Sequence, residues 1–111
     1  MIPNYQEFMR PFLQIAYKAH NNGQVHEVKL RDVINQLAVQ FNLTDEERTE
    51  TLPSGKQPVL DNRVGWARTY LTKAGLLDVT RRAHFVITPR GIEALKDNVD
   101  INNEYLKRFD E

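Results

Sequence analysis

The sequence predicts a mainly helical α+β fold that carries one small β-hairpin. In several segments, apolar residues recur at three- and four-residue steps, as they do on one face of an amphipathic helix. Two β-prone runs, 76–80 and 84–87, are separated by only three residues, which is typical of a hairpin. Capping and stop residues mark where individual helices begin and end.

Length and composition indicate one compact domain. The chain has 111 residues, of which 41% are hydrophobic and 27% charged, as in ordinary globular domains. No signal peptide opens it, and no apolar run is long enough to cross a membrane. The absence of cysteine excludes disulfides and thiolate metal sites and fits a reducing compartment. We therefore expect a cytoplasmic protein with no membrane partner.

A first helix is expected over residues 4–20, with Asn4 as its cap. Pro11 removes one backbone donor inside this segment. We therefore expect either a kink or an irregular opening turn before a helix that starts near Arg10. The alternating residues 24–28 then predict a short strand.

Two long helices and a short one are expected in the centre of the chain. Residues 30–41 form a second amphipathic segment. Thr44 and Glu47 form a capping box, which starts a short acidic helix at residue 45. A third long helix is expected over residues 59–74, and Gly75 ends it in the left-handed conformation.

The hairpin follows this third helix and has residues 81–83 at its tip. Thr88 and Pro89 then begin another helix, which frays near Asn98. A last helical stretch covers residues 102–109. The order helix, strand, helix, helix, hairpin, helix is that of a winged helix-turn-helix, whose third long helix commonly enters the DNA major groove.

Charge is distributed unevenly along the chain, although fifteen basic and fifteen acidic residues give a net charge of zero. Residues 1–50 hold five basic and seven acidic groups, and residues 92–111 hold three and six. Residues 51–91 hold seven basic and two acidic groups, a net +5. The neutral total argues against extensive phosphate binding, whereas the basic central segment favours it.

The third long helix has a predicted inner face and an outer one. At about 100° per residue, Leu60, Val64, Ala67, Leu71 and Ala74 face the core. The remaining arc offers side chains that can read base edges or bind phosphate. The residues of this arc that we predict to contact DNA are Asn62, Arg63, Trp66, Arg68, Thr69 and Lys73.

Three further cations lie next to this helix. Arg81 and Arg82 at the hairpin tip and Lys56 before the helix are predicted to bind phosphates. Gly65 costs about 1 kcal/mol relative to alanine in a helix, and an outward glycine allows another backbone to approach closely. Trp66 also has a structural interpretation, which is to fill a gap between elements.

No constellation of residues predicts catalysis, a metal or a cofactor. The segment 53–56 lacks the first glycine of a phosphate-binding loop. The three histidines, at positions 20, 26 and 84, lie in different elements without carboxylates at ligand spacing. Asp100, Glu104 and Lys107 have the wrong spacing for a nuclease triad and fall in a helical context. The chain is therefore not expected to be an enzyme by itself.

Most of the chain resembles the N-terminal domain of the Mrr family of restriction endonucleases. The most specific stretch is LPSGKQPVLDNRVGWARTYLTKAGLL, residues 52–77, and PNYQEFMRPFL and FVITPRGIEAL also match. The resemblance implies that this domain docks on DNA. It also implies a following nuclease domain of the PD-(D/E)xK type that cleaves modified, commonly methylated, DNA.

The resemblance divides the chain into two parts. Residues 1–98 are expected to be the DNA-binding domain and residues 99–111 a helical linker toward a C-terminal nuclease domain that the sequence lacks. The chain is then either a piece of a longer enzyme or a stand-alone relative. The apolar side chains of the linker favour the first option, because a linker helix needs such a surface to dock a further domain. These side chains are Tyr105, Leu106 and Phe109.

Two functions of different classes remain open. The first is a module that docks a nuclease on double-stranded DNA, with modified DNA the favoured target. The second is a protein-interaction or dimerisation module that uses the same glycine- and tryptophan-bearing face. The oligomeric state is open, and a homo-oligomer is among the expectations. Strong salt dependence of binding would distinguish DNA docking from an apolar interface.

Overall fold

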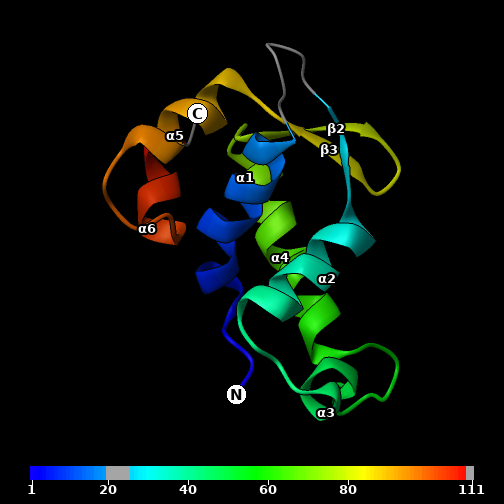
Figure 1. Ribbon diagram of the computed structural model, residues 1–111. Helices are drawn as coiled ribbons and strands as arrows, with labels where there is room; N and C mark the ends of the chain where they lie inside the picture. The colour runs from blue at the N-terminus through cyan, green and yellow to red at the C-terminus, as the bar shows by residue number, and fades with distance from the viewer. Residues whose placement is uncertain (20–25, 110–111) are drawn as a thin grey trace.

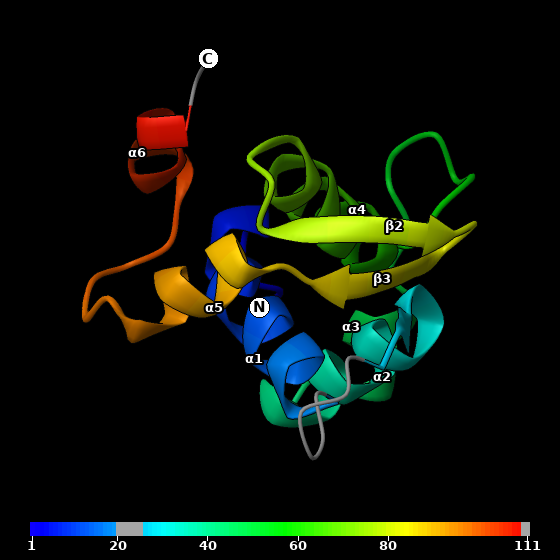
Figure 2. The ribbon, with the colours of Figure 1, turned by 90° about the horizontal axis from the view of Figure 1, so that it is seen from above.

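The computed structural model describes residues 1–19 and 26–109. Helices surround a central helix, α4, with a small sheet on one side of it and the C-terminal helix α6 on the other (Figures 1 and 2). This α+β architecture, compatible with a winged helix, confirms the predicted fold class. The elements in chain order are η1 (Tyr5–Phe8), α1 (Met9–Lys18), β1 (Val28–Lys29), α2 (Leu30–Gln40), α3 (Asp45–Thr49), α4 (Val59–Lys73), β2 (Leu77–Arg81), β3 (His84–Ile87), α5 (Pro89–Lys96), α6 (Asn103–Leu106) and η2 (Lys107–Phe109).

The sheet has three antiparallel strands in the order β1-β3-β2. Strands β2 and β3 form the predicted hairpin, which runs beside α4 (Figure 2). The turn at its tip places Ala83 at a φ of +62°. Of the described residues in and next to the strand predicted over 24–28, Val28 and Lys29 pair with β3, and the chain enters α2 directly afterwards. Positions 24 and 25 lie outside the described residues.

The core lies between α1, α2, α4 and the sheet. The predicted inner face of α4 is buried, with Val64, Ala67 and Leu71 fully inaccessible to solvent. Phe12 of α1 packs edge-on against Phe85 of β3, with ring centroids 6.2 Å apart. Complete burial of each large apolar side chain contributes about 1.5–3 kcal/mol, so this contact surface fixes which face of α4 points outward.

The start of the chain follows the irregular-turn alternative. Asn4 caps the 3₁₀ turn η1, and its side chain accepts from the backbone N–H of Glu7 while the Glu7 carboxylate accepts from the N–H of Asn4. Helix α1 begins at Met9, so Pro11 lies in its first turn, where the missing N–H costs no helical hydrogen bond.

A close junction joins α4 to α5. Gly75 has a φ of +81°, as predicted, and ends α4. The Thr88 hydroxyl donates to the Gly75 carbonyl oxygen at 2.6 Å and accepts from the N–H of Gly91 at 3.0 Å. Gly91 packs against the backbone of Leu76, where a Cβ atom would collide with the Leu76 carbonyl. The junction holds the sheet against the end of the central helix.

The C-terminal segment packs on the domain itself. The predicted helical stretch 102–109 is confirmed as α6 and η2, and Tyr105 and Leu106 are buried. The backbone N–H of Asn103 donates to Oε1 of Gln6 at 2.9 Å, and its side-chain amide donates to the Tyr5 hydroxyl. Tyr105 and Leu106 thus pack on this domain, and the expected docking of a further domain by the segment stays a prediction. The boundary after residue 98 stays a prediction.

None of the helices in residues 1–19 and 26–109 has the length and apolar character that a membrane span requires.

Candidate nucleic-acid interface

The outer face of α4 is the surface that the sequence singles out. Asn62, Trp66, Thr69 and Lys73 follow one another along it at helical spacing. Trp66 is 49% exposed, which is unusual for a tryptophan, and Lys73 is exposed at the end of the helix. The buried residues of α4 lie on the opposite face, so the structure leaves this row of side chains available to a partner.

Several polar groups on this face already have partners within the chain. The Thr69 hydroxyl donates to the Gly65 carbonyl oxygen at 3.0 Å, and the Asn62 amide donates to Oε1 of Gln57 at 3.2 Å. Arg68 is partly buried, and its Nε donates to the same Gly65 oxygen while its guanidinium lies 5.9 Å from the centre of the Phe85 ring. A hydroxyl has one hydrogen, so Thr69 must release its helical bond before it can donate to a phosphate.

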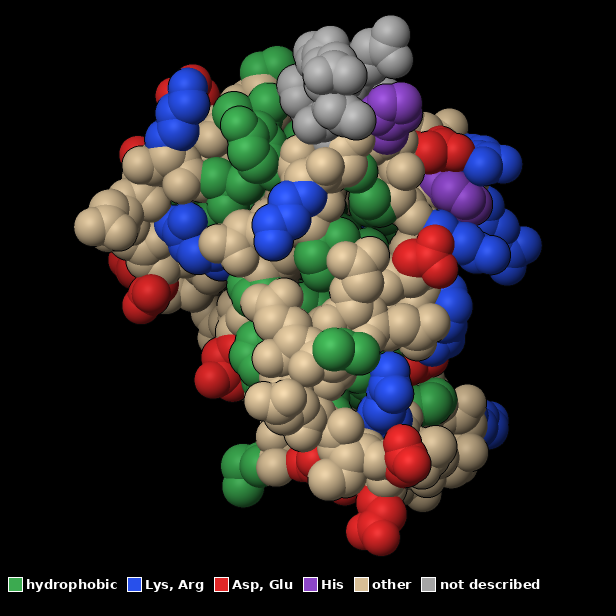
Figure 3. Space-filling view, in the orientation of Figure 1, with side chains coloured by type: hydrophobic (Ala, Val, Ile, Leu, Met, Phe, Trp, Pro, Cys, Tyr) green, Lys and Arg blue, Asp and Glu red, His purple; other side chains and the backbone are tan. Residues whose placement is uncertain are grey.

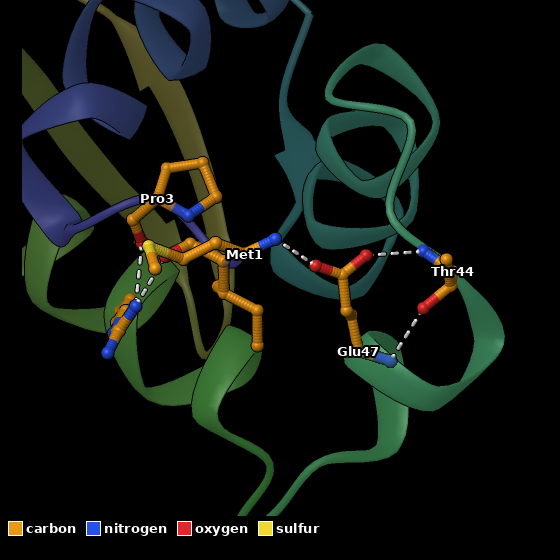
Figure 4. Close-up of polar contacts among 6 residues, drawn as sticks. Met1, Pro3, Thr44 and Glu47 are labelled. Atoms are coloured by element: carbon orange, nitrogen blue, oxygen red, sulfur yellow. Dashed lines mark hydrogen bonds and ion pairs between the residues drawn. The ribbon is translucent and has the colours of Figure 1, made fainter.

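Arg63 points along the protein surface toward the N-terminus. Its Nη1 donates to the carbonyl oxygens of Ile2 and Pro3, at 2.6 and 3.2 Å. Residues 1–4, here called the N-terminal arm, are thereby held along α4 (Figure 4). The side chain predicted to enter the DNA groove thus has a structural task, and its contact with DNA stays a prediction.

Glu47 holds the other end of the N-terminal arm. Its carboxylate binds the amino group of Met1 and accepts from the N–H of Thr44 at 2.9 Å (Figure 4). Two hydrogen bonds lower the pKa of Glu47 to about 2: the one from the Met1 amino group has the larger effect, and the one from the Thr44 N–H the next largest. The capping box of α3 thus serves also as an anchor for the arm.

A hollow of about 710 Å³ lies between the N-terminal arm and α4. Two aromatic side chains that line it are stacked: the rings of Tyr5 and Tyr70 are 5.4 Å apart and inclined by 21°. Trp66 lies 6.1 Å from Tyr70 at 35°. Tyr5 was not singled out from the sequence, and no periodicity could have linked it to a helix so distant in the chain. The lining residues include Tyr5, Asn62, Arg63, Trp66 and Tyr70.

The hairpin tip contains two arginines in different environments. Arg81 is paired with Glu27, whose Oε1 lies 2.7 Å from Nη2 of the arginine. Hydrogen bonds from Thr80 and then from Arg81 lower the pKa of Glu27. Arg82 is exposed and forms no ion pair with another described residue. Figure 3 shows Lys and Arg side chains gathered over this part of the molecule with acidic side chains beside them.

Two further features flank the start of α4. Lys56 is exposed in the loop before the helix, next to Gly55, which has a φ of +73°. Arg31 of α2 pairs with Asp61 in the first turn of α4, Nη2 to Oδ2 2.5 Å. This pair neutralises the carboxylate that would otherwise repel a phosphate there, and it leaves Lys56 as the exposed cation of the loop.

Within residues 1–19 and 26–109, no three His, Cys, Asp or Glu side chains come close enough together to hold a metal ion. Around α4 the structure brings together a half-buried amide, an exposed indole and several cations. Such a set offers hydrogen-bonding, stacking and charged groups to a partner.

Comparison with known proteins assigns the family. Residues 5–97 match the model of the Mrr N-terminal domain. The chain is 33% identical over 93 residues to the type IV methyl-directed restriction enzyme EcoKMrr of Escherichia coli (strain K12). The match covers 83% of this chain but only 28% of that relative. No solved structure is similar enough to count as a match. This chain belongs to the family of Mrr N-terminal domains, which confirms the resemblance found in its sequence.

Proposed function

We propose that this chain is the DNA-binding module of an Mrr-like restriction system protein. It docks on double-stranded DNA through the outer face of α4 and the hairpin between β2 and β3. It performs no catalysis itself and delivers a nuclease domain that belongs to the full-length protein. The observation that carries the proposal is the outward row of Asn62, Trp66 and Lys73 on α4, in the segment of the chain that has a net charge of +5. Trp66 and Lys73 are exposed and Asn62 is half-buried.

The dimensions of α4 suit the major groove. Its 15 residues give a length of about 22 Å, at a rise of about 1.5 Å per residue. The groove, about 12 Å wide, admits one helix. In this arrangement, the Asn62 amide reads an adenine edge and Lys73 binds phosphate. Lys56 and Arg82 bind the backbone on either side, while Arg81 contributes less because Glu27 neutralises it.

Modified DNA is the proposed target class. The relative from Escherichia coli is described as methyl-directed, and the match to it includes the whole of α4. A methyl group in the major groove adds apolar surface, and Trp66 offers an apolar surface on the groove-facing side of the helix. The most specific part of the proposal is that this domain binds methylated DNA more tightly than plain DNA.

Fluorescence anisotropy with plain and methylated copies of one labelled duplex tests it. We expect binding of the wild-type chain to weaken steeply with salt. In the Lys73→Ala/Arg82→Ala double variant, the slope of log affinity against log salt should be smaller by about 1.8, because each of the two phosphate contacts contributes about 0.9. The matched control is Lys18→Ala/Lys96→Ala, which removes two exposed lysines from α1 and α5. Binding that is independent of salt, or equally weakened by both double variants, would contradict DNA docking.

The opposite result would favour the second functional class. If the wild-type chain binds no duplex at low salt but self-associates in sedimentation velocity, and Trp66→Leu abolishes that association, the face is a dimerisation surface.

A further inference from the structure

The hollow beside Trp66 has features that duplex docking alone does not use. Tyr5 and Tyr70 form a stacked pair on one side of it, and Trp66 contributes an indole that is about half exposed. Elsewhere in the described part of the chain, the phenylalanine rings of the core are buried. The half-exposed indole beside this partly buried pair is suited to a flat ligand, because stacking needs an accessible π-face.

Contacts from three elements hold the walls of the hollow in place. Arg63 binds the carbonyl oxygens of Ile2 and Pro3 in the N-terminal arm. The Tyr5 hydroxyl accepts from Nδ2 of Asn103, 2.5 Å away in α6. The site thus exists before a ligand arrives, so little ordering entropy opposes binding.

Polar groups lie at the edge of the hollow as well. The Oδ1 oxygen of Asn62 makes no hydrogen bond with a described residue, so it can accept from an amino group of a ligand. Only Nη1 of Arg63 is used by the arm, which leaves further guanidinium N–H groups as donors. Glu7 also lines the hollow, but its carboxylate accepts from the N–H of Asn4. A ligand with an apolar flat face and a polar edge is therefore complementary to this hollow.

We propose that the hollow binds one unpaired nucleobase of the DNA held on α4, stacked against Trp66. This inference rests on the proposed function, because Trp66 lies on the face that meets the duplex. The charges nearby favour a nucleotide over a neutral ring: Arg63 lines the hollow, and Lys73 lies two turns beyond Trp66 on the outer face of α4. A phosphate next to a base in the hollow can then bind the Arg63 guanidinium.

The balance of energies specifies which base can enter. Stacking on one or two aromatic rings offsets part of the cost of unstacking and unpairing a base, and that cost is least for a base that is already unpaired. The hollow is therefore expected to select a mismatched or bulged position rather than to open a stable pair.

Two duplexes test the proposal, one fully paired and one with a single bulged 2-aminopurine. Trp66 is the sole tryptophan of the chain, so its emission reports on the hollow directly. We expect the wild-type chain to bind the bulged duplex about tenfold more tightly, within the range for one base stacked on an aromatic ring, and Trp66 emission to be quenched. Trp66→Leu should bind both duplexes equally, and Trp66→Phe should keep part of the preference.

Matched variants separate this effect from a loss of folding. Tyr17→Leu removes another half-exposed aromatic ring, on α1 and outside the hollow, and should keep the tenfold preference. Thermal unfolding followed by circular dichroism should show Trp66→Leu folded, because Trp66 lies at the surface and leucine keeps part of the apolar area that the indole buries. Anisotropy and 2-aminopurine fluorescence measure binding of the variant that lacks the indole.

The outcomes distinguish this inference from the proposed function. Salt-dependent binding of both duplexes with equal affinity and no quenching overturns the base site and leaves DNA docking intact. If no duplex binds, adenosine monophosphate is titrated against Trp66 emission, with ribose 5-phosphate as the control lacking a base. If adenosine monophosphate quenches Trp66 emission and ribose 5-phosphate does not, the base site is supported although DNA docking has failed. Equal responses to both compounds, or none, overturn the base site as well.

Discussion

Two glycines in helices lie in opposite surroundings. At Gly91, at the start of α5, an added Cβ atom would lie 2.7 Å from Cγ1 of Ile87 and closer still to the Leu76 carbonyl oxygen. At Gly65, on the outer face of α4, the nearest atom to such a Cβ is Nη2 of Arg68, 3.9 Å away. The first glycine is required by the packing of the chain itself. At the second, the described structure has room for a methyl group, so close packing within the chain does not require a glycine there.

Polar groups show the same contrast. At the junction around Gly91, the Thr88 hydroxyl both donates and accepts, and Nη1 of Arg90 donates to the Ala74 carbonyl oxygen at 2.8 Å. On the outer face of α4, Lys73 is exposed and forms no ion pair with another described residue. The polar groups at the junction are thus satisfied inside the molecule, whereas the Lys73 ammonium group on the outer face is open to a partner.

Gly91→Ala is the substitution expected to have the largest effect. The methyl group would collide with backbone atoms, which cannot move aside as the end of a flexible side chain can. We expect a loss of about 3 kcal/mol in the free energy of unfolding, at the upper end of overpacking effects. Urea unfolding followed by circular dichroism measures it, and a loss below about 1 kcal/mol would show that the junction adapts.

Thr88→Val compares the polar groups of the two regions. It leaves the Gly75 carbonyl and the Gly91 N–H without their partner in a buried place, so we expect a loss of about 2 kcal/mol. Thr69→Val on α4 is the matched control. Its hydroxyl bonds only to its own helix, and the free energy of unfolding should change by less than about 0.5 kcal/mol. Equal losses in the two variants would remove the contrast.

Gly65→Ala should separate stability from binding. The site has room for a methyl group, so the free energy of unfolding should rise by up to about 1 kcal/mol. If the DNA backbone approaches α4 closely at this point, the same methyl group should weaken duplex binding several-fold. Thermal unfolding and anisotropy on one protein sample measure both. A stabilised variant with unchanged affinity would show that Gly65 faces only solvent.

Glu27→Gln should strengthen DNA binding by a few-fold. The substitution removes the carboxylate that neutralises Arg81, so the slope of log affinity against log salt should steepen by about 0.9, the contribution of one further phosphate contact. Glu93→Gln, which releases Lys96 on α5, provides the control and should leave the slope unchanged. A slope unaffected by Glu27→Gln would show that the hairpin tip stays away from the duplex.

Glu47→Gln should have the smallest effect, visible only as a change with pH. The pKa of Glu47 in the folded chain, about 2, is below its ordinary value of 4.5. The ionised carboxylate therefore stabilises the fold above about pH 4.5, and this contribution disappears as the pH falls toward 2. The wild type should melt above Glu47→Gln at pH 6, and the difference should shrink toward pH 2.5. Glu50→Gln, an exposed carboxylate nearby, is the control.

The parts of the fold that sequence predicted are those that depend on neighbouring residues. The capping box of Thr44 and Glu47 and the left-handed Gly75 involve groups only a few positions apart. The two faces of α4 follow from helical spacing alone. Such local signals placed the third long helix correctly, and with it the surface proposed to bind DNA.

The organisation of the candidate site could not be predicted in this way. The Tyr5–Tyr70 stack, the hold of Arg63 on the N-terminal arm and the pairing of Glu27 with Arg81 each join residues far apart in the chain. None produces a periodic or compositional signal. Arginines that look equivalent in sequence therefore differ in structure, because one is paired, one holds the arm and one, Arg82, is exposed.

The packing of the C-terminal segment bears on where the cooperative unit of this domain ends. Ile101, Tyr105 and Leu106 are buried, and Arg10 of α1 donates to the carbonyl oxygens of Asp97 and Val99. A chain truncated after residue 98 would lose these side chains and expose the apolar surface that they cover. The segment predicted to be a linker thus covers apolar surface of this domain, and its removal would leave that surface open to water.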